Sequence, residues 1–329
     1  MLQYLVIFRK RTTAIALILF FSCSGISWAH HPSGASGTGQ AGPVTTISAS
    51  TLQKGKWVFE LQAEYLTFDT FSDTELLGFA EAGNDVHTFD SFFHAFASIS
   101  YGIKDNLTLS LKMPYTSINN IEEVHQAEPD EIHHLGDSQG IGDMTILGYY
   151  RFVKRPDIYF ESSLLLGLKV PTGNTHKKDV HGERFETEHQ PGSGSWDPMI
   201  GLAATKRFGL LSLDANMLYI VATKGAQDTD LGDFLNYNAA ISYHAFLLKK
   251  ISCDLIIEVN GEWKQEQKIN GAKDKNSGGT TVFLSPGLRV SMNDRWTAYL
   301  SIGVPVIQDL NGIQTDTSVR AITGISTGF

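Results

Sequence analysis

The feature that most constrains this chain is an alternation of apolar and polar residues in segments about eleven residues long. In the segment 56–68 (KWVFELQAEYLTF), the apolar side chains Trp57, Phe59, Leu61 and Tyr65 alternate with polar ones. A β-strand points successive side chains to opposite faces, so this period of two gives a strand with one apolar and one polar face. The pattern predicts strands that meet apolar surroundings on one side only.

The same pattern recurs along the chain in twelve segments. They are residues 56–68, 89–103, 106–118, 142–152, 158–170, 196–208, 211–221, 235–247, 253–263, 282–292, 296–306 and 319–329. A tilted strand of roughly 9–11 residues crosses the hydrocarbon layer of a membrane. We therefore expect an all-β fold, a transmembrane antiparallel β-barrel of about twelve strands.

The connections between these segments alternate in length. Five are tight: 102–106, 153–157, 209, 248–251 and 293–295. Six are long: 69–88, 119–140, 171–195, 222–234, 264–281 and 307–317. Outer-membrane barrels have short periplasmic turns and longer external loops, whereas a soluble periplasmic β-sandwich has no reason to alternate in this way. The pattern thus predicts a barrel embedded in the outer-membrane lipid of a Gram-negative-type cell.

Aromatic residues at segment ends support the same fold. Trp57, Trp196, Trp263 and Trp296 each lie near a strand end, on the apolar side of their strand. Such positions are typical of the aromatic girdles at the two membrane interfaces. Phe329 shares the apolar parity of the last strand and resembles the terminal phenylalanine that the barrel-assembly machinery recognises, which makes that machinery an expected partner.

The first 29 residues have the features of a signal peptide. A basic stretch, 9–11, precedes an apolar core, 14–21, and Ser27 and Ala29 are the small residues expected around a cleavage site. We expect export and cleavage near Ala29; Cys23 leaves a lipoprotein site as the alternative. Residues 30–55 are rich in glycine and serine and predict a flexible lead-in or a plug, and residues 56–329 form the barrel.

Composition excludes several classes of function. The formal net charge is −9, which argues against a nucleic-acid partner. There is no G-x-S-x-G element, and the strand histidines His94 and His244 lie on inward parity in distant segments. We therefore predict a protein that is not an enzyme and needs no cofactor.

Charged residues recur on the polar parity of the strands, where they would face the barrel interior. These candidate pore-lining residues are Glu60, Glu64, Lys112, Asp143, Arg151, Glu161, Lys169, Arg207, Asp214, Glu258, Glu262, Arg289 and Arg320. A charge inside a strand is tolerated where water or an opposite charge meets it. Two interpretations stay open: a polar pore wall that sets selectivity, or salt bridges that fill a narrow lumen.

The long loops are acidic and contain histidines. Residues 69–88 contain five acids and residues 119–140 contain six, in both cases without lysine or arginine. The candidate metal ligands are His30, His31, His125, His133, His134, His176, His181 and His189. Imidazole with carboxylate suits Zn²⁺, Cu²⁺ or Ni²⁺, whereas the alternative is a set of solvated polar loops.

Four local strings resemble a known family. They are Gly140–Phe152 (GIGDMTILGYYRF), Lys169–Asn174 (KVPTGN), Gly192–Pro198 (GSGSWDP) and Lys112–Tyr115 (KMPY). These strings are similar to motifs of the outer-membrane transporter family associated with phenol meta-pathway degradation. The resemblance covers about residues 95–329 and implies a channel or transporter for small, including aromatic, compounds.

We therefore expect a passive outer-membrane channel for the uptake or efflux of small solutes. The alternative is a surface barrel whose acidic, histidine-rich external loops bind metal or a partner.

Overall fold

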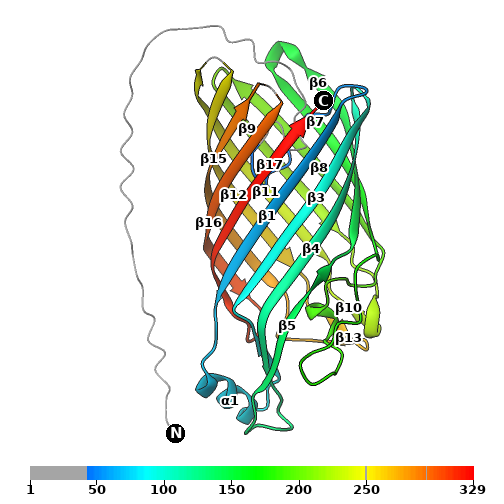
Figure 1. Cartoon of the computed structure of the whole chain (residues 1–329), viewed down its shortest axis with the longest axis vertical. Coiled ribbons are helices and arrows are strands. Elements are labelled where there is room, and N and C mark those ends of the chain that lie inside the picture. Colours follow the sequence, from blue (N-terminus) through cyan, green and yellow to red (C-terminus); the bar gives the residue numbers. More distant parts are fainter. Residues whose placement is uncertain (1–42, 249, 294) are drawn as a thin grey trace. The chain divides into compact units, whose positions relative to one another are not determined.

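The computed structural model of this chain describes residues 43–248, 250–293 and 295–329. Within these ranges twelve long strands, each antiparallel to its neighbours, form a closed barrel (Figure 1). The barrel strands are β1 (Trp57–Asp69), β3 (Ser91–Lys104), β4 (Leu107–Val124), β6 (Met144–Arg155), β7 (Phe160–Val170), β8 (Asp197–Phe208), β9 (Leu211–Ile220), β11 (Phe234–Leu248), β12 (Ile251–Lys264), β15 (Gly279–Met292), β16 (Trp296–Leu310) and β17 (Asp316–Gly328). The predicted fold class is confirmed. The predicted signal peptide, its cleavage site and His30 and His31 lie outside the described residues.

The barrel closes because its first and last strands pair with each other. β1 pairs with β17 from Val58↔Gly328 to Asp69↔Asp316, and with β3 on its other side. Each remaining barrel strand pairs with its neighbours in chain order, including β4 with β6. Backbone N–H and C=O groups have no water partners in hydrocarbon, so closure is what allows these strands to span a membrane.

The outer face of the barrel is apolar, as the alternation predicts. In β1, Phe59, Leu61 and Tyr65 are exposed on the outside, whereas Glu60 and Glu64 face the interior. The four tryptophans among the described residues are exposed as well, between 36% for Trp263 and 55% for Trp196. An exposed apolar belt of this extent would be unfavourable in water but is the normal surface of a protein in lipid.

No helix among the described residues is long and apolar enough to cross a bilayer.

Tight turns join the strands at one end of the barrel and long connections join them at the other. One tight turn contains the 3₁₀ turn η1 (Pro156–Ile158), and Asn293 (φ 55°) begins another. The structured parts of the long connections gather at the opposite end, as the labels α1, β10 and β13 show in Figure 1. They are α1 (Asp73–Glu81), β2 (Val86–Thr88), β5 (His133–Ile141), η2 (Thr187–His189), η3 (Ala226–Asp228), β10 (Thr229–Asp230), β13 (Lys268–Ile269) and β14 (Ala272–Lys273).

The end of β4 is the predicted boundary that differs most from the structure. The segment expected at 106–118 continues as β4 to Val124, where it pairs with β5 and β2. A register shift between Ile118 and Ile121 surrounds Asn120, whose φ is 54°, and interrupts the alternation. The extension is stabilised by loop packing, because Ile118 and Ile121 are buried with Phe185.

The long connection 69–88 folds into a helix, which sequence periodicity alone did not predict. The carboxylate of Glu75 accepts hydrogen bonds from the backbone N–H (2.9 Å) and the hydroxyl (2.7 Å) of Ser72, which precedes α1. This arrangement is half of a capping box and favours helix initiation. Leu76 and Ala80 then bury one side of α1 against Val124.

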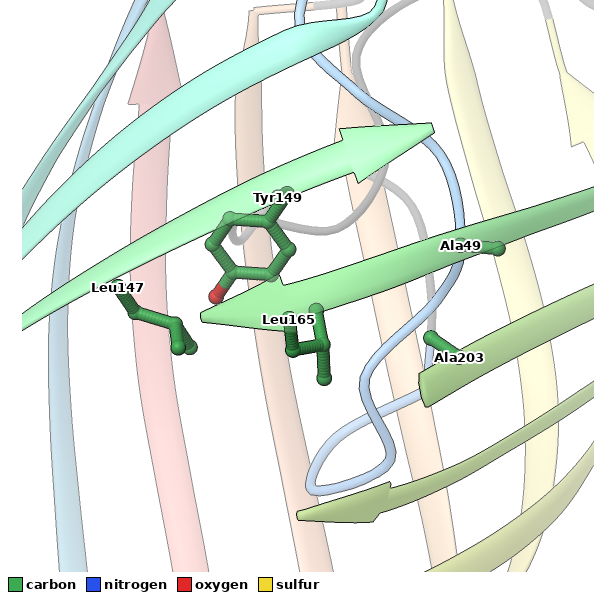
Figure 2. Packing of buried hydrophobic residues seen from close by; sticks show 5 residues of the cluster. All are labelled: Ala49, Leu147, Tyr149, Leu165 and Ala203. Carbon is green, nitrogen blue, oxygen red and sulfur yellow. The ribbon is translucent and has the colours of Figure 1, made fainter. Parts of the chain in front are cut away.

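Residues 43–54, hereafter the lumenal segment, precede β1 and run inside the barrel. Ala49 packs against Leu147 and Tyr149 of β6, Leu165 of β7 and Ala203 of β8, all on the inner wall (Figure 2). The sequence predicts residues 30–55 to be a flexible lead-in or a plug. Residues 30–42 lie outside the described residues, and from residue 43 onward the segment packs against the inner wall of the barrel.

Candidate functional site

The lumenal segment enters the barrel past a single glycine of β3. The N–H of Gly55 donates to the carbonyl of Gly102 (2.8 Å), and the N–H of Gly102 donates to the carbonyl of Lys56 (2.9 Å). A Cβ on Gly102 would lie 2.0 Å from the carbonyl oxygen of Gln53. Only glycine allows the two backbones to approach this closely.

The middle of the segment is held by hydroxyl and carboxylate groups of β7 and β8. The hydroxyl of Ser50 donates to Glu161 (2.6 Å), which Arg151 also contacts at 3.0 Å. The N–H of Ala49 donates to the hydroxyl of Thr205 (2.9 Å). The segment has no regular secondary structure, so these side chains satisfy backbone groups that a sheet would otherwise pair.

The first residues of the lumenal segment are bound by charged side chains from two further strands. The backbone N–H groups of Thr45 (3.1 Å) and Thr46 (3.0 Å) donate to Glu258 of β12, which is fully buried. Arg289 of β15 donates to the carbonyl of Pro43 (2.7 Å). Glu258 therefore anchors the lumenal segment rather than forming open pore wall, whereas Arg289 both contacts the segment and lines the cavity beside it.

Beside the lumenal segment lies a cavity of about 360 Å³. Six charged residues line it: Glu60, Glu64, Lys112, Glu262, Arg289 and Arg320. They comprise three carboxylates and three cations, so their formal charges cancel. The wall also presents His94 and aromatic rings, among them Phe96, Tyr149, Phe234 and Tyr299. This lumenal cavity is thus polar, electrically balanced and partly aromatic.

Arg320 is the centre of the charged network in this cavity. Its guanidinium donates to Asn260 (2.7 Å) and lies 3.7 Å from Glu64 and 3.3 Å from Glu262. The same group stacks 4.1 Å above the ring of Phe283. A planar guanidinium satisfies several acceptors at once, which suits a buried cation in a polar lumen.

The strands on either side of β17, β1 and β16, present a second polar cluster. The hydroxyl of Tyr299 contacts Glu60 (2.8 Å) and Gln62 (2.9 Å). The ammonium of Lys112 lies 3.9 Å from the centre of the Phe96 ring. Lys112 therefore keeps its cation close to an aromatic face, a geometry that favours cation–π attraction.

The thirteen predicted pore-lining residues fall into three groups. Those that line the cavity are the six named above. Those that contact the lumenal segment, directly or through one neighbour, are Arg151, Glu161, Arg207, Asp214 and Glu258. The remaining two, Asp143 and Lys169, lie where the wall meets the 171–195 connection, and Lys169 bonds to Asp197 there. The predicted residues thus divide between a cavity wall and contacts that fill the lumen, and a role of the cavity residues in selectivity stays a prediction.

The loop histidines occupy different environments. His125, His133 and His134 each pair with a carboxylate, at 2.9, 3.1 and 2.9 Å respectively. His176 contacts the hydroxyl of Thr175 (3.1 Å), and His181 lies on the exposed part of the same connection. These five do not gather at one point.

His189 differs from the others because it is buried. It lies beside Glu188 and His87, outside the lumenal cavity. Burial, with the neighbouring His87, lowers the pKa of His189 to about 4. Burial opposes ionisation of Glu188, but the positive charges of His87, His189 and Lys264 hold the pKa of Glu188 below its usual value.

Comparison with known proteins identifies the family. Residues 77–306 match the family described as "Putative MetA-pathway of phenol degradation". The chain belongs to this family. The resemblance inferred from the four sequence strings is therefore confirmed. No curated protein is detectably similar in sequence.

The barrel fold of this phenol-degradation family member is shared by a solved structure. An outer membrane channel from Pseudomonas putida F1 superposes with a TM-score of 0.61 at 15% identity, covering 85% of this chain and 98% of the other. The KdgM porin superposes with a TM-score of 0.42 at 12% identity, covering 82% of this chain and 99% of the porin. The translocator domain of the autotransporter NalP from Neisseria meningitidis superposes with a TM-score of 0.42 at 12% identity, covering 84% of this chain and 89% of that domain.

The four strings that carry the family resemblance converge on Asp143. Its carboxylate accepts hydrogen bonds from the N–H groups of Gly173 and Ser193, both at 2.8 Å. The adjacent Gly142 donates its N–H to the carbonyl of Pro114 (2.9 Å). A Cβ on Gly192 would lie 2.6 Å from the Cα of Gly173, so the motif glycines permit this close packing. In this family member, the motifs build a loop junction at the end of the barrel.

Sequence reasoning missed several residues of the cavity and the loops. Tyr299 and Asn260 have inward parity in their strands, so the period-two pattern could have found them had uncharged residues been considered. His87 lies in a connection noted only for its acids. Its proximity to His189 depends on the pairing of β2 with β4, which no local pattern signals.

Proposed function

We propose that this protein is a passive outer-membrane channel for small solutes. The observation that carries the proposal is a lumenal cavity of about 360 Å³, with balanced charges, inside a closed barrel whose outer face is apolar. A polar lumen inside a lipid-facing shell is the usual arrangement of a membrane channel. The lumenal segment narrows this passage and so favours small solutes over polymers.

Aromatic compounds are the solute class that we favour. The cavity wall combines rings, such as Phe96 and Tyr299, with the cations of Lys112 and Arg320. Rings offer stacking faces and cations attract oxygen groups, so monocyclic aromatic compounds that carry a hydroxyl or carboxyl group suit this wall. The description of the family, which refers to phenol degradation, agrees with this choice.

Single-channel recording in planar bilayers tests the proposal. Purified barrel should give discrete conductance steps in potassium chloride. Reversal potentials would then be measured with sodium chloride on one side and either sodium benzoate or sodium acetate on the other. Acetate is the matched non-aromatic carboxylate, and the permeability relative to chloride should be greater for benzoate than for acetate. Absence of conductance steps would overturn the proposal that the protein is a channel. Equal permeability of benzoate and acetate would overturn only the proposed preference for aromatic solutes.

We propose that export and assembly follow the predicted signals. Cleavage near Ala29 would give a mature chain that begins at His30, which mass spectrometry of the membrane-extracted protein would detect. Phe329 exchanges backbone hydrogen bonds with Trp57 and exposes its ring. Phe329→Ala should lower the amount of assembled barrel in outer-membrane fractions more than Phe329→Tyr, if the assembly machinery recognises an aromatic ring there.

A further inference from the structure

Three potential metal ligands meet outside the lumenal cavity, among the long connections of the barrel. His87 is the middle residue of β2, which pairs with the end of β4. Glu188 and His189 lie in η2, within the connection between β7 and β8. The fold brings together side chains from two connections that are far apart in sequence.

The distances between the three ligand groups suit one small cation. The Nδ1 atom of His87 lies 3.4 Å from Oε1 of Glu188, and Nε2 of His189 lies 4.0 Å from the same oxygen. Each residue offers a ligand atom within 4.8 Å of the other two. Zinc bonds nitrogen and oxygen at about 2.0–2.2 Å, so its ligands lie about 3–3.5 Å apart and only a small contraction is needed.

His189 provides an independent indication of a ligand. Its side chain is 2% exposed, and neither ring nitrogen has a hydrogen-bond partner. Buried polar atoms are nearly always hydrogen-bonded, and an exception calls for an explanation such as an ion. By contrast, the exposed His125 and His134 each bond to a carboxylate that accounts for one ring nitrogen.

The surrounding loop holds these ligands in place through its own contacts. The side chain of Gln190 donates to the carbonyls of Phe185 (2.8 Å) and Lys177 (3.0 Å). The hydroxyl of Thr187 donates to the carbonyl of Ala226 (3.0 Å). The ring of His87 lies parallel to that of Phe89. Prepositioned ligands reduce the ordering that metal binding would otherwise require.

We propose that His87, Glu188 and His189 bind a divalent transition-metal ion of the zinc class. Two imidazoles and one carboxylate match the ligand set of open zinc sites, which leaves a fourth position for water. The ion joins β2 to the connection between β7 and β8, and so links two external loops. This role is independent of solute passage, because none of the three residues lines the lumenal cavity.

Metal titration of the folded barrel tests the proposal. The chain would be untagged, treated with a chelator, and carry His30→Ala and His31→Ala to remove the amino-terminal histidine pair. Calorimetry with Zn²⁺ should give one tight site, and Co²⁺ should give the visible absorption of a four-coordinate ion. His87→Ala and Glu188→Gln should each weaken binding by at least the roughly 10-fold that loss of a group behind a ligand costs, because each removes a ligand itself.

His134→Ala is the matched control, because His134 also pairs with a glutamate but lies outside the cluster. This variant should bind Zn²⁺ as the parent chain does, and retained β-type circular dichroism should show that every variant is folded. The proposal is overturned if the parent chain binds no stoichiometric Zn²⁺. It is also overturned if binding survives undiminished in the double variant His87→Ala with Glu188→Gln.

Discussion

Glu258 is the residue on which the position of the lumenal segment most depends. Its carboxylate is fully buried and accepts the N–H groups of Thr45 and Thr46. Replacing Glu258 with alanine leaves these two backbone donors without an acceptor. We expect Glu258→Ala to lower the free energy of unfolding by about 2–3 kcal/mol, the range for hydrogen bonds to a charged group.

Urea unfolding in detergent micelles would measure this loss. Glu258→Gln keeps one acceptor oxygen and is the matched control, so it should destabilise the barrel less than Glu258→Ala does. Equal stability of both variants and the parent would mean that these contacts do not hold the segment.

At the scale of the element, α1 makes a prediction about pH. The hydrogen bonds from the backbone and hydroxyl of Ser72 lower the pKa of Glu75. A folded-state pKa below the unfolded value contributes stability above the unfolded pKa and loses it as pH falls through the folded one. We therefore expect the start of α1 to open more readily once the pH falls below about 4.

Hydrogen exchange followed by mass spectrometry would detect this opening. Glu75→Gln should lower the protection factors across α1 at neutral pH and remove most of their pH dependence, once the intrinsic pH dependence of amide exchange has been divided out. Glu81→Gln, at the other end of the helix, should change little. If the two variants exchange alike, the contact between Ser72 and Glu75 does not stabilise the helix.

The elements show which parts of the fold the sequence could predict. Barrel strands were predictable because lipid requires an apolar face, and this requirement imposes a period of two on the chain. The extension of β4 beyond Ile118 was not predictable, because there the strand packs against loops rather than lipid and Asn120 interrupts the alternation.

The lumenal segment was hard to predict for a different physical reason. Small polar residues are typical of flexible chain, but in a lumen they are also the residues that hydrogen-bond to a polar wall. Ser48 and Ser50, for example, bond to Thr205 and Glu161. For the candidate site, inward parity predicted which charged residues face the interior. Which of them line the cavity and which contact the lumenal segment could be decided only from the path of residues 43–54.

At the scale of the whole molecule, the acidic loops should favour cations. Residues 119–140 contain six acids and no lysine or arginine, whereas the charges of the lumenal cavity cancel. An acidic mouth raises the local concentration of cations. Selectivity should therefore fall between about 0.1 M and 1 M salt, as the screening length shortens from about 10 Å to about 3 Å.

Reversal potentials in a potassium chloride gradient would measure this selectivity. Neutralising the loop with Glu128→Gln, Asp130→Asn and Glu131→Gln should lower cation preference at low salt and leave conductance at high salt unchanged. Equal reversal potentials for this variant and the parent would show that these three acids do not determine the cation selectivity.

The central claim is that a lipid-embedded barrel conducts through a lumen narrowed by residues 43–54. The most direct test compares single-channel conductance of the parent chain with that of a variant lacking residues 43–52. We predict discrete steps from both, with larger steps from the variant because the segment no longer fills part of the lumen. Unchanged steps would show that the segment does not narrow the passage, and no steps from either chain would contradict the account of a channel.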